Sequence, residues 1–156
     1  MSKILTSVLK WLGAVVILWP VGAGAAESVA ASRWSLLVDT AWVASHQNDP
    51  GVRIVDVRPA AEYLKGHIEG AVQVSAESLT TTRGGIKGVV AGPDVIEEIM
   101  RNLGIGRRTK VVLYDASDGK WASYAFWVSD YHGHPSAAVM DGSLNKWVKE
   151  GRPLSK

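Results

Sequence analysis

The 156-residue chain contains no cysteine. Without a thiol it forms no disulfide and cannot carry out thiol or persulfide chemistry by itself. An excess of one charge is also missing: beyond residue 26, fifteen basic residues are matched by fifteen acidic ones. Because no basic excess remains to bind a phosphate backbone, we expect no nucleic-acid partner.

Long apolar runs are missing as well. The first ten residues carry Lys3 and Lys10 without an acid, an apolar stretch follows from Trp11 to Val21, and small residues occupy 22–26. This pattern predicts a secretory signal peptide over residues 1–26 and a periplasmic destination. A membrane anchor is the alternative, but it needs about 20 apolar residues. We therefore expect export, with no stable membrane insertion after signal cleavage.

The remaining sequence is long enough for one hydrophobic core. After a short tail at residues 27–34, we expect a single domain over residues 35–156. Runs rich in β-branched residues predict strands at 52–57, 71–74, 111–114 and 137–140. Apolar residues at helical spacing predict the intervening helices, with Pro93 opening one of them, whereas 75–91 reads as an irregular connection. The alternation predicts an α/β fold with a mainly parallel sheet and helices on both faces.

Three predicted strands are followed by, or end in, an aspartate: Asp56, Asp115 and Asp141. Binding sites in such sheets form beyond the carboxyl ends of the strands. The loop Asp115, Ala116, Ser117, Asp118, Gly119, Lys120 also leads into a helix N-terminus, whose backbone N–H groups form an anion cradle. A cysteine at its first position would become a reactive thiolate. The carboxylate of Asp115 accepts the same N–H groups, which predicts a cradle filled from within.

Two segments resemble signatures of the rhodanese family. Asp56–Ala71 is similar to the first signature of that family, and Asp141–Trp147 resembles its closing turn and helix. The likeness extends over nearly all of Leu36–Ser155 and implies a rhodanese-like α/β fold with a mainly parallel five-stranded sheet. Rhodaneses are sulfurtransferases that pass sulfane sulfur from donors such as thiosulfate to thiophilic acceptors, through a cysteine persulfide on the loop after the central strand. Asp115 stands at that position here.

Tandem thiosulfate sulfurtransferases carry their cysteine in the C-terminal half, and their N-terminal half commonly shows Tyr-Asp at the matching point. Tyr114–Asp115 resembles that inactive half. The resemblance therefore implies a non-catalytic domain without catalytic residues or cofactors, whose partner is a cysteine-bearing rhodanese-like domain. This chain departs from the family pattern at Glu69, where proline is common, and at Ser143, where a second glycine is common.

Two rival functions stay open. In the first, the chain is a protein-binding module of the cell envelope that docks a partner through its emptied site and exposed aromatic side chains. Five tryptophans beyond residue 26 favour an interface, although they could equally fill the core: Trp34, Trp42, Trp121, Trp127 and Trp147. The second rival, phosphoryl chemistry at Asp115, is weaker because the loop offers only Asp118 as a further carboxylate.

Other polar residues invite a catalytic, ligand-binding or metal-binding interpretation. Arg58 is a candidate contact for an anion or a partner domain, or else forms a surface salt bridge with Glu62. We expect His67 to be a hydrogen-bonded structural histidine. Three candidates for a metal site lie at a predicted helix end, where imidazoles also suit the helix dipole, so we expect no metal: Asp130, His132 and His134. Asp56 and Asp141 are expected to cap turns rather than to form an acid–base pair.

Overall fold

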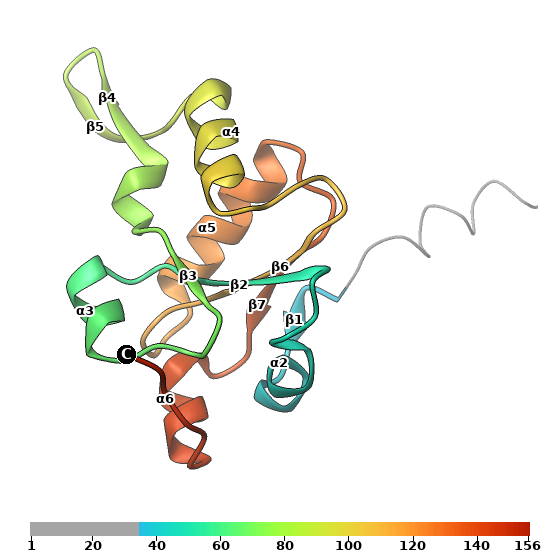
Figure 1. The fold of residues 1–156 in the computed structure, drawn as a ribbon. Helices are drawn as coiled ribbons and strands as arrows, with labels where there is room; N and C mark the ends of the chain where they lie inside the picture. The colour runs from blue at the N-terminus through green and yellow to red at the C-terminus, as the bar shows by residue number, and fades with distance from the viewer. Residues whose placement is uncertain (1–34) are drawn as a thin grey trace, which may run out of the picture. The chain divides into compact units, whose positions relative to one another are not determined.

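The computed structural model describes residues 35–156, which are coloured by position in Figure 1. The predicted signal peptide at 1–26 and the tail at 27–34 lie outside the described residues. Within residues 35–156, no helix has the length and apolar character needed to cross a bilayer.

A parallel sheet forms the centre of the described domain. Its strands lie in the order β1 (Leu37–Val38), β7 (Ala137–Met140), β6 (Lys110–Tyr114), β2 (Val52–Asp56) and β3 (Val72–Gln73). Every neighbouring pair in this five-stranded sheet is parallel. The predicted α/β fold with a mainly parallel sheet is therefore confirmed.

Helices connect the strands: α2 (Thr40–His46), α3 (Ala60–Lys65), α4 (Pro93–Asn102), α5 (Lys120–Tyr131) and α6 (Ser143–Lys149). Local sequence sets their ends. Asp39 caps α2, since its carboxylate accepts a hydrogen bond from the Trp42 backbone N–H at 2.7 Å. Pro93 occupies the first turn of α4, where its missing N–H costs nothing.

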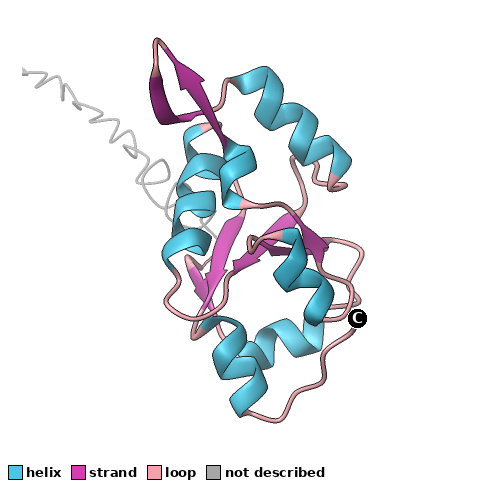
Figure 2. Cartoon of the chain, turned by 90° about the vertical axis from the view of Figure 1, so that its left-hand side faces the viewer, coloured by secondary structure: helices cyan, strands magenta, loops and turns pink. Residues whose placement is uncertain are grey.

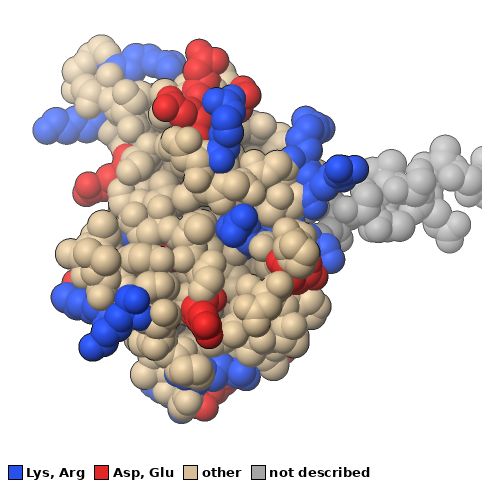
Figure 3. All heavy atoms as spheres, in the orientation of Figure 1, with Lys and Arg blue, Asp and Glu red and all other residues tan. Residues whose placement is uncertain are grey.

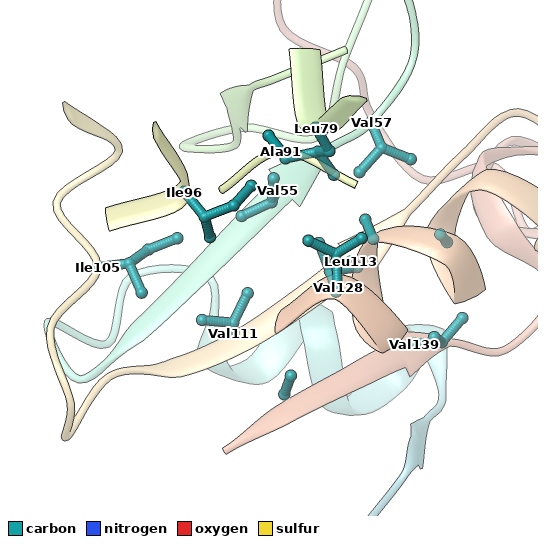
Figure 4. Packing of buried hydrophobic residues seen from close by; sticks show 13 residues of the cluster. Val55, Val57, Leu79, Ala91, Ile96, Ile105, Val111, Leu113, Val128 and Val139 are labelled. Carbon is teal, nitrogen blue, oxygen red and sulfur yellow. The ribbon is translucent and has the colours of Figure 1, made fainter. Parts of the chain in front are cut away.

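The sheet is buried on both faces because its side chains alternate between two apolar clusters. On β6, Val111 and Leu113 belong to one cluster, and Val112 and Tyr114 belong to the other. The first cluster packs under α4 and α5 (Figure 4), and the second packs under α2 and α6. Figure 2 shows the helices on both sides of the strands, as the sequence predicts.

The segment 75–91 is ordered, so its interpretation as an irregular connection is wrong. It forms a short 3-10 helix, η1 (Ala76–Leu79), and an antiparallel hairpin of β4 (Thr80–Arg83) and β5 (Ile86–Val90), which projects at the upper left of Figure 1. Gly84 and Gly85 both have positive φ, 59° and 81°, as a tight two-residue hairpin turn requires. The Gly-Gly pair that follows Thr80–Arg83 is the signal that identifies this turn in the sequence.

The adjacent strands β7, β6 and β2 bring their carboxyl ends to one edge of the sheet. Asp56 ends β2, Asp115 follows β6, and Asp141 follows β7. On the face drawn in Figure 3 the two signs of charge are interspersed. This is the edge at which binding sites form in such sheets.

Candidate functional site

The loop after β6 places the Asp115 carboxylate beneath the N-terminus of α5. Asp115 is 2% exposed, whereas Ala116, Ser117 and Asp118 are exposed to solvent. Gly119 has a positive φ of 73°, which turns the chain so that the helix begins at Lys120. The loop thus folds over its own first side chain.

Four donors surround this carboxylate. Its Oδ1 accepts hydrogen bonds from the Gly119 N–H at 3.1 Å and from the Ser143 hydroxyl at 2.6 Å. Its Oδ2 accepts from the N–H groups of Trp121 at 3.0 Å and Ala122 at 3.3 Å. The amides at a helix N-terminus carry a partial positive charge that favours an anion at this position. The cradle expected from the sequence is therefore present, and it is occupied by the side chain of Asp115.

The backbone of the same residue caps a second helix. The Asp115 carbonyl accepts from the Leu144 N–H at 3.0 Å, and the Ala116 carbonyl accepts from the Asn145 N–H at 3.0 Å. Both donors belong to the first turn of α6, which has no side-chain cap of its own. Asp115 thus joins α5 to α6, two helices that cover opposite faces of the sheet.

Ser143 is the site residue that sequence reasoning did not assign to the site. It is 1% exposed and has a φ of 53°. This backbone conformation favours glycine and is unfavourable in free energy for any residue that has a side chain. Its hydroxyl meets Asp115. The sequence shows that Ser143 replaces a glycine that is common in the family. Only the three-dimensional structure shows that Ser143 contacts Asp115.

The outer part of the loop is solvated. The Asp118 carboxylate accepts from the backbone N–H of Lys120 at 3.2 Å, and the Lys120 ammonium lies 4.8 Å from the centre of the Trp121 ring. Asp118 adds negative charge beside the cradle without entering it. An incoming anion would meet this carboxylate as well as that of Asp115.

Arg58 is held inside the protein by Asp56. The Arg58 Nη2 donates to Asp56 Oδ2 at 2.6 Å and to the Gly66 carbonyl at 2.8 Å. Burial alone would lower the pKa of Arg58, but the hydrogen bonds and the charge of Asp56 outweigh it and raise the pKa. The alternative of a surface salt bridge to Glu62 is wrong, because Glu62 pairs with Lys65. A role for Arg58 in binding an anion or a partner stays a prediction, and such a ligand would compete with Asp56.

A cavity of about 650 Å³ opens beside the start of α5. Val57, Ile99, Leu103 and Trp121 contribute apolar surface to it, and Glu77 is its only charged lining residue. The rest of the lining includes neutral polar residues, and a cavity whose one charged lining residue is a carboxylate does not favour small anions such as thiosulfate.

The remaining candidates have structural partners. The His67 ring stacks on Tyr63 at 3.7 Å, and its Nδ1 is 3.1 Å from the Tyr63 carbonyl, as expected of a structural histidine. Asp141 pairs with Lys146 at 2.9 Å. Within residues 35–156 no three His, Asp or Glu side chains converge to hold a metal ion, and Asp130, His132 and His134 form no such group.

The tryptophans divide between core and surface. Trp147 is 2% exposed and donates from Nε1 to the Pro153 carbonyl at 2.9 Å. Trp121 and Trp127, by contrast, are 47% and 48% exposed along α5. Core packing therefore accounts for Trp147 and leaves the two α5 tryptophans to be explained.

Comparison with known proteins adds to this geometry. Residues 39–150 match the family described as rhodanese-like domain. The chain is 40% identical over 126 residues to a protein named sulfur carrier protein TtuD from Thermus thermophilus, covering 77% of this chain and 42% of the relative. It is 29% identical to 3-mercaptopyruvate sulfurtransferase from Escherichia coli, covering 70% of this chain and 42% of that protein.

Solved structures agree with the fold. The crystal structure of SseA, a 3-mercaptopyruvate sulfotransferase from Escherichia coli, superposes with a TM-score of 0.71 at 27% identity, covering 79% of this chain and 52% of the other. A Lactobacillus plantarum protein superposes with a TM-score of 0.56 at 26% identity and is covered over 88% of its length. The chain spans less than half the length of the two curated relatives named above.

Proposed function

The chain belongs to the rhodanese family, and from this membership we propose that it is a non-catalytic domain of the sulfurtransferase type. Its role is structural, or it forms one side of a substrate pocket, in the manner of the N-terminal half of a tandem thiosulfate sulfurtransferase. The sulfur-carrying cysteine then belongs to a partner domain.

The Asp115 contacts carry this proposal. Three backbone N–H groups and the Ser143 hydroxyl all bind its carboxylate. Sulfur transfer through a persulfide needs a thiolate sulfur to hold the transferred atom. A carboxylate supplies no such sulfur, and the chain has no cysteine elsewhere to replace it.

The surroundings of the loop support the same conclusion. Glu77 lines the adjacent cavity, and Asp118 lies on the outer loop. Both carboxylates would repel thiosulfate or a persulfide anion. The basic residue of this loop, Lys120, lies over the Trp121 ring.

Sulfur transfer from thiosulfate to cyanide tests the proposal. We expect no thiocyanate from the purified wild-type chain. Asp115→Cys should gain a reactive thiol with weak turnover, and Asp115→Cys/Asp118→Gly should turn over faster, because removal of the Asp118 charge lets an anionic donor approach. Wild-type turnover that persists in preparations free of contaminating sulfurtransferases would refute the proposal.

The tandem arrangement makes its own prediction. The relatives are about twice as long as the region they share with this chain, so a second domain of similar size is the expected partner. We expect the coding sequence beyond Lys156, or a separate gene of the same organism, to encode a rhodanese-like domain with a cysteine loop. A genome without any cysteine-bearing rhodanese-like domain would contradict this role.

Aromatic side chains on α5 favour a second candidate, a protein-binding module of the cell envelope. The rings of Trp121, Tyr124, Trp127 and Tyr131 follow one another at centroid distances of 6.4, 6.1 and 5.5 Å. Tyr131 is 67% exposed and adds to the half-exposed tryptophans. Tryptophan and tyrosine are enriched where proteins bind one another.

Sedimentation and dye binding test this candidate. The wild-type domain should bind an apolar fluorescent dye or self-associate at high concentration, and Trp127→Ser/Tyr131→Ser should reduce both effects. Leu64→Ser, at an exposed apolar residue of α3, is the control away from α5. Dye binding as low as that of a well-packed monomer would exclude the module.

We further propose that residues 1–26 direct export to the periplasm. The two lysines, the apolar stretch and the small residues of this segment support the proposal. Expression of the full chain in a Gram-negative host should give a periplasmic protein that begins near Ala26 or Glu27. A protein that keeps Met1 and stays in the cytoplasm would refute it.

A further inference from the structure

A second cavity, of about 520 Å³, lies at the edge of the sheet where β6 and β7 begin, opposite the Asp115 loop. Its walls come from α4, the segment Ile105–Arg107, the end of α5 and the turn Gly133–Pro135. Small-molecule sites in proteins commonly occupy about 300–1,000 Å³. The cavity is therefore large enough for a small organic ligand.

The deep side of this cavity is apolar. Ile96 and Ile105 are 2% and 8% exposed and belong to the core cluster, and Met100 packs against that cluster. Pro93 and Pro135 complete the apolar lining. This surface suits the hydrocarbon part of a ligand.

The rim carries net positive charge. Arg101 and Glu97 form an exposed ion pair at 2.8 Å, so their charges offset each other. Arg107 also lines the cavity and forms no ion pair with another residue of the described chain. In the cavity beside the start of α5, Glu77 is the one charged lining residue, so the two cavities differ in the sign of their charge.

His134 in the wall is a neutral imidazole with a defined proton position. Its Nδ1 accepts from the Ser136 N–H at 3.3 Å, so its Nε2 carries the proton and donates to the Gly106 carbonyl at 3.3 Å. Burial lowers the pKa of His134, and the charge of Arg107 lowers it further, although the bond to Gly106 opposes both effects. A negative charge in the cavity would act against Arg107 and raise this pKa.

His132, on the end of α5, also lines the cavity. Its Nε2 is buried and has no hydrogen-bond partner. Buried polar atoms in proteins nearly always have a partner. This nitrogen therefore has an unused hydrogen-bonding capacity beside a cationic cavity, which a ligand group could satisfy.

We propose that this cavity binds a small organic anion. A single carboxylate or phosphate group lies at Arg107 and the imidazole of His132, and the apolar part rests on Ile96, Met100 and Ile105. The site is independent of the proposed sulfurtransferase role, since it uses the opposite edge of the sheet and no residue of the Asp115 loop.

Histidine NMR on the full chain tests the proposal, with phenyl phosphate as the probe. The charged and titratable residues that line the cavity with His134 are Glu97 and Arg101 on α4, Arg107 in the segment Ile105–Arg107 and His132 directly after α5. Phenyl phosphate should shift the ring signals of His132 and His134 with a saturable curve below about 10 mM. It should also move the titration midpoint of His134 to higher pH.

Matched probes and variants separate the two parts of the site. Phenol lacks the charge and inorganic phosphate lacks the apolar body, so each should bind at least about tenfold more weakly than phenyl phosphate. Arg107→Ala should weaken binding by a similar factor, whereas Arg108→Ala, outside the cavity lining, should leave it unchanged.

Three results would overturn the proposal. The first is an absence of saturable shifts, and the second is equal binding of phenol and phenyl phosphate. The third is an equal loss of binding in the Arg107 and Arg108 variants, which would indicate attraction to general surface charge rather than a site.

Discussion

Asp115 and Asp141 occupy similar places in the chain but differ in what their carboxylates do. Each follows a buried parallel strand and precedes a helix that begins after a glycine with positive φ, Gly119 or Gly142. The Asp115 carboxylate is buried and accepts four hydrogen bonds. The Asp141 carboxylate is largely exposed and pairs with Lys146.

Loop length explains this difference. Four residues separate Asp115 from α5, so the chain can turn back and bring its helix amides over the carboxylate. A single residue, Gly142, separates Asp141 from α6, whose first amides donate to the carbonyls of Asp115 and Ala116. The loop after β6 therefore supplies hydrogen-bond acceptors to the N-termini of both α5 and α6, and the Asp141 carboxylate lies at the surface.

The largest difference between the two aspartates should appear in stability. Asp115→Ala leaves three amides and the Ser143 hydroxyl without their acceptor, which should lower the free energy of unfolding by about 3 kcal/mol or more. Asp141→Ala removes one exposed ion pair and should change it within experimental error. Urea denaturation of both variants measures the difference. Similar losses in the two variants would contradict the distinction.

Ser143 should show a smaller effect that separates its hydrogen bond from its backbone strain. Ser143→Ala loses the bond to Asp115 and keeps the positive φ, so it should cost about 1–2 kcal/mol of stability. Ser143→Gly loses the same bond but relieves the strain, so its cost should be smaller by about 1 kcal/mol. The same denaturation experiment decides. An Ala variant at least as stable as the Gly variant would mean that the strain is unimportant, and an Ala variant as stable as the wild type would mean that the hydroxyl bond is unimportant.

The smallest effect concerns the pKa of Lys146. The hydrogen bond that Lys146 donates to Asp141 raises this pKa; desolvation opposes the rise, and the charges of Asp141 and of nearby carboxylates add to it. A raised lysine pKa stabilises the fold below the unfolded value, and the contribution is lost as pH rises through the folded value. Asp141→Asn should therefore lower the Lys146 titration midpoint in NMR, whereas Asp115→Asn should leave it unchanged. A lower Lys146 midpoint in Asp115→Asn and an unchanged midpoint in Asp141→Asn would contradict this assignment.

Much of the fold follows from the sequence because its patterns are local. The β-branched run ending at Tyr114 and the helix opened by Pro93 lie where the periodicity predicts. The hairpin at 80–90 does not follow from the pattern of apolar residues, because its strands are exposed and lack a buried alternating face. Its one local signal is the Gly84–Gly85 turn.

The site was predictable only in part, for a physical reason. Asp115 precedes a predicted helix by one short loop, and this spacing predicts that its carboxylate contacts the amides of α5. The contact between Asp115 and Ser143 joins residues 28 positions apart, and the pairing of Arg58 with Asp56 rather than Glu62 depends on which side of the chain is buried. Contacts of this kind arise from the packing of strands and helices, which a local pattern does not contain.

The central claim is that the Asp115 loop is an anion cradle filled by its own carboxylate, and a cysteine at the same position tests it most directly. In Asp115→Cys the amides of α5 should stabilise the thiolate, so the pH midpoint for alkylation should fall below the value of about 8.5 for a free cysteine. Asp141→Cys is the matched control: its exposed thiolate would have Lys146 beside it but no set of helix amides, so its midpoint should fall less. A midpoint for Asp115→Cys at or above the control, in a folded variant, would show that this loop does not stabilise an anion and would contradict the account.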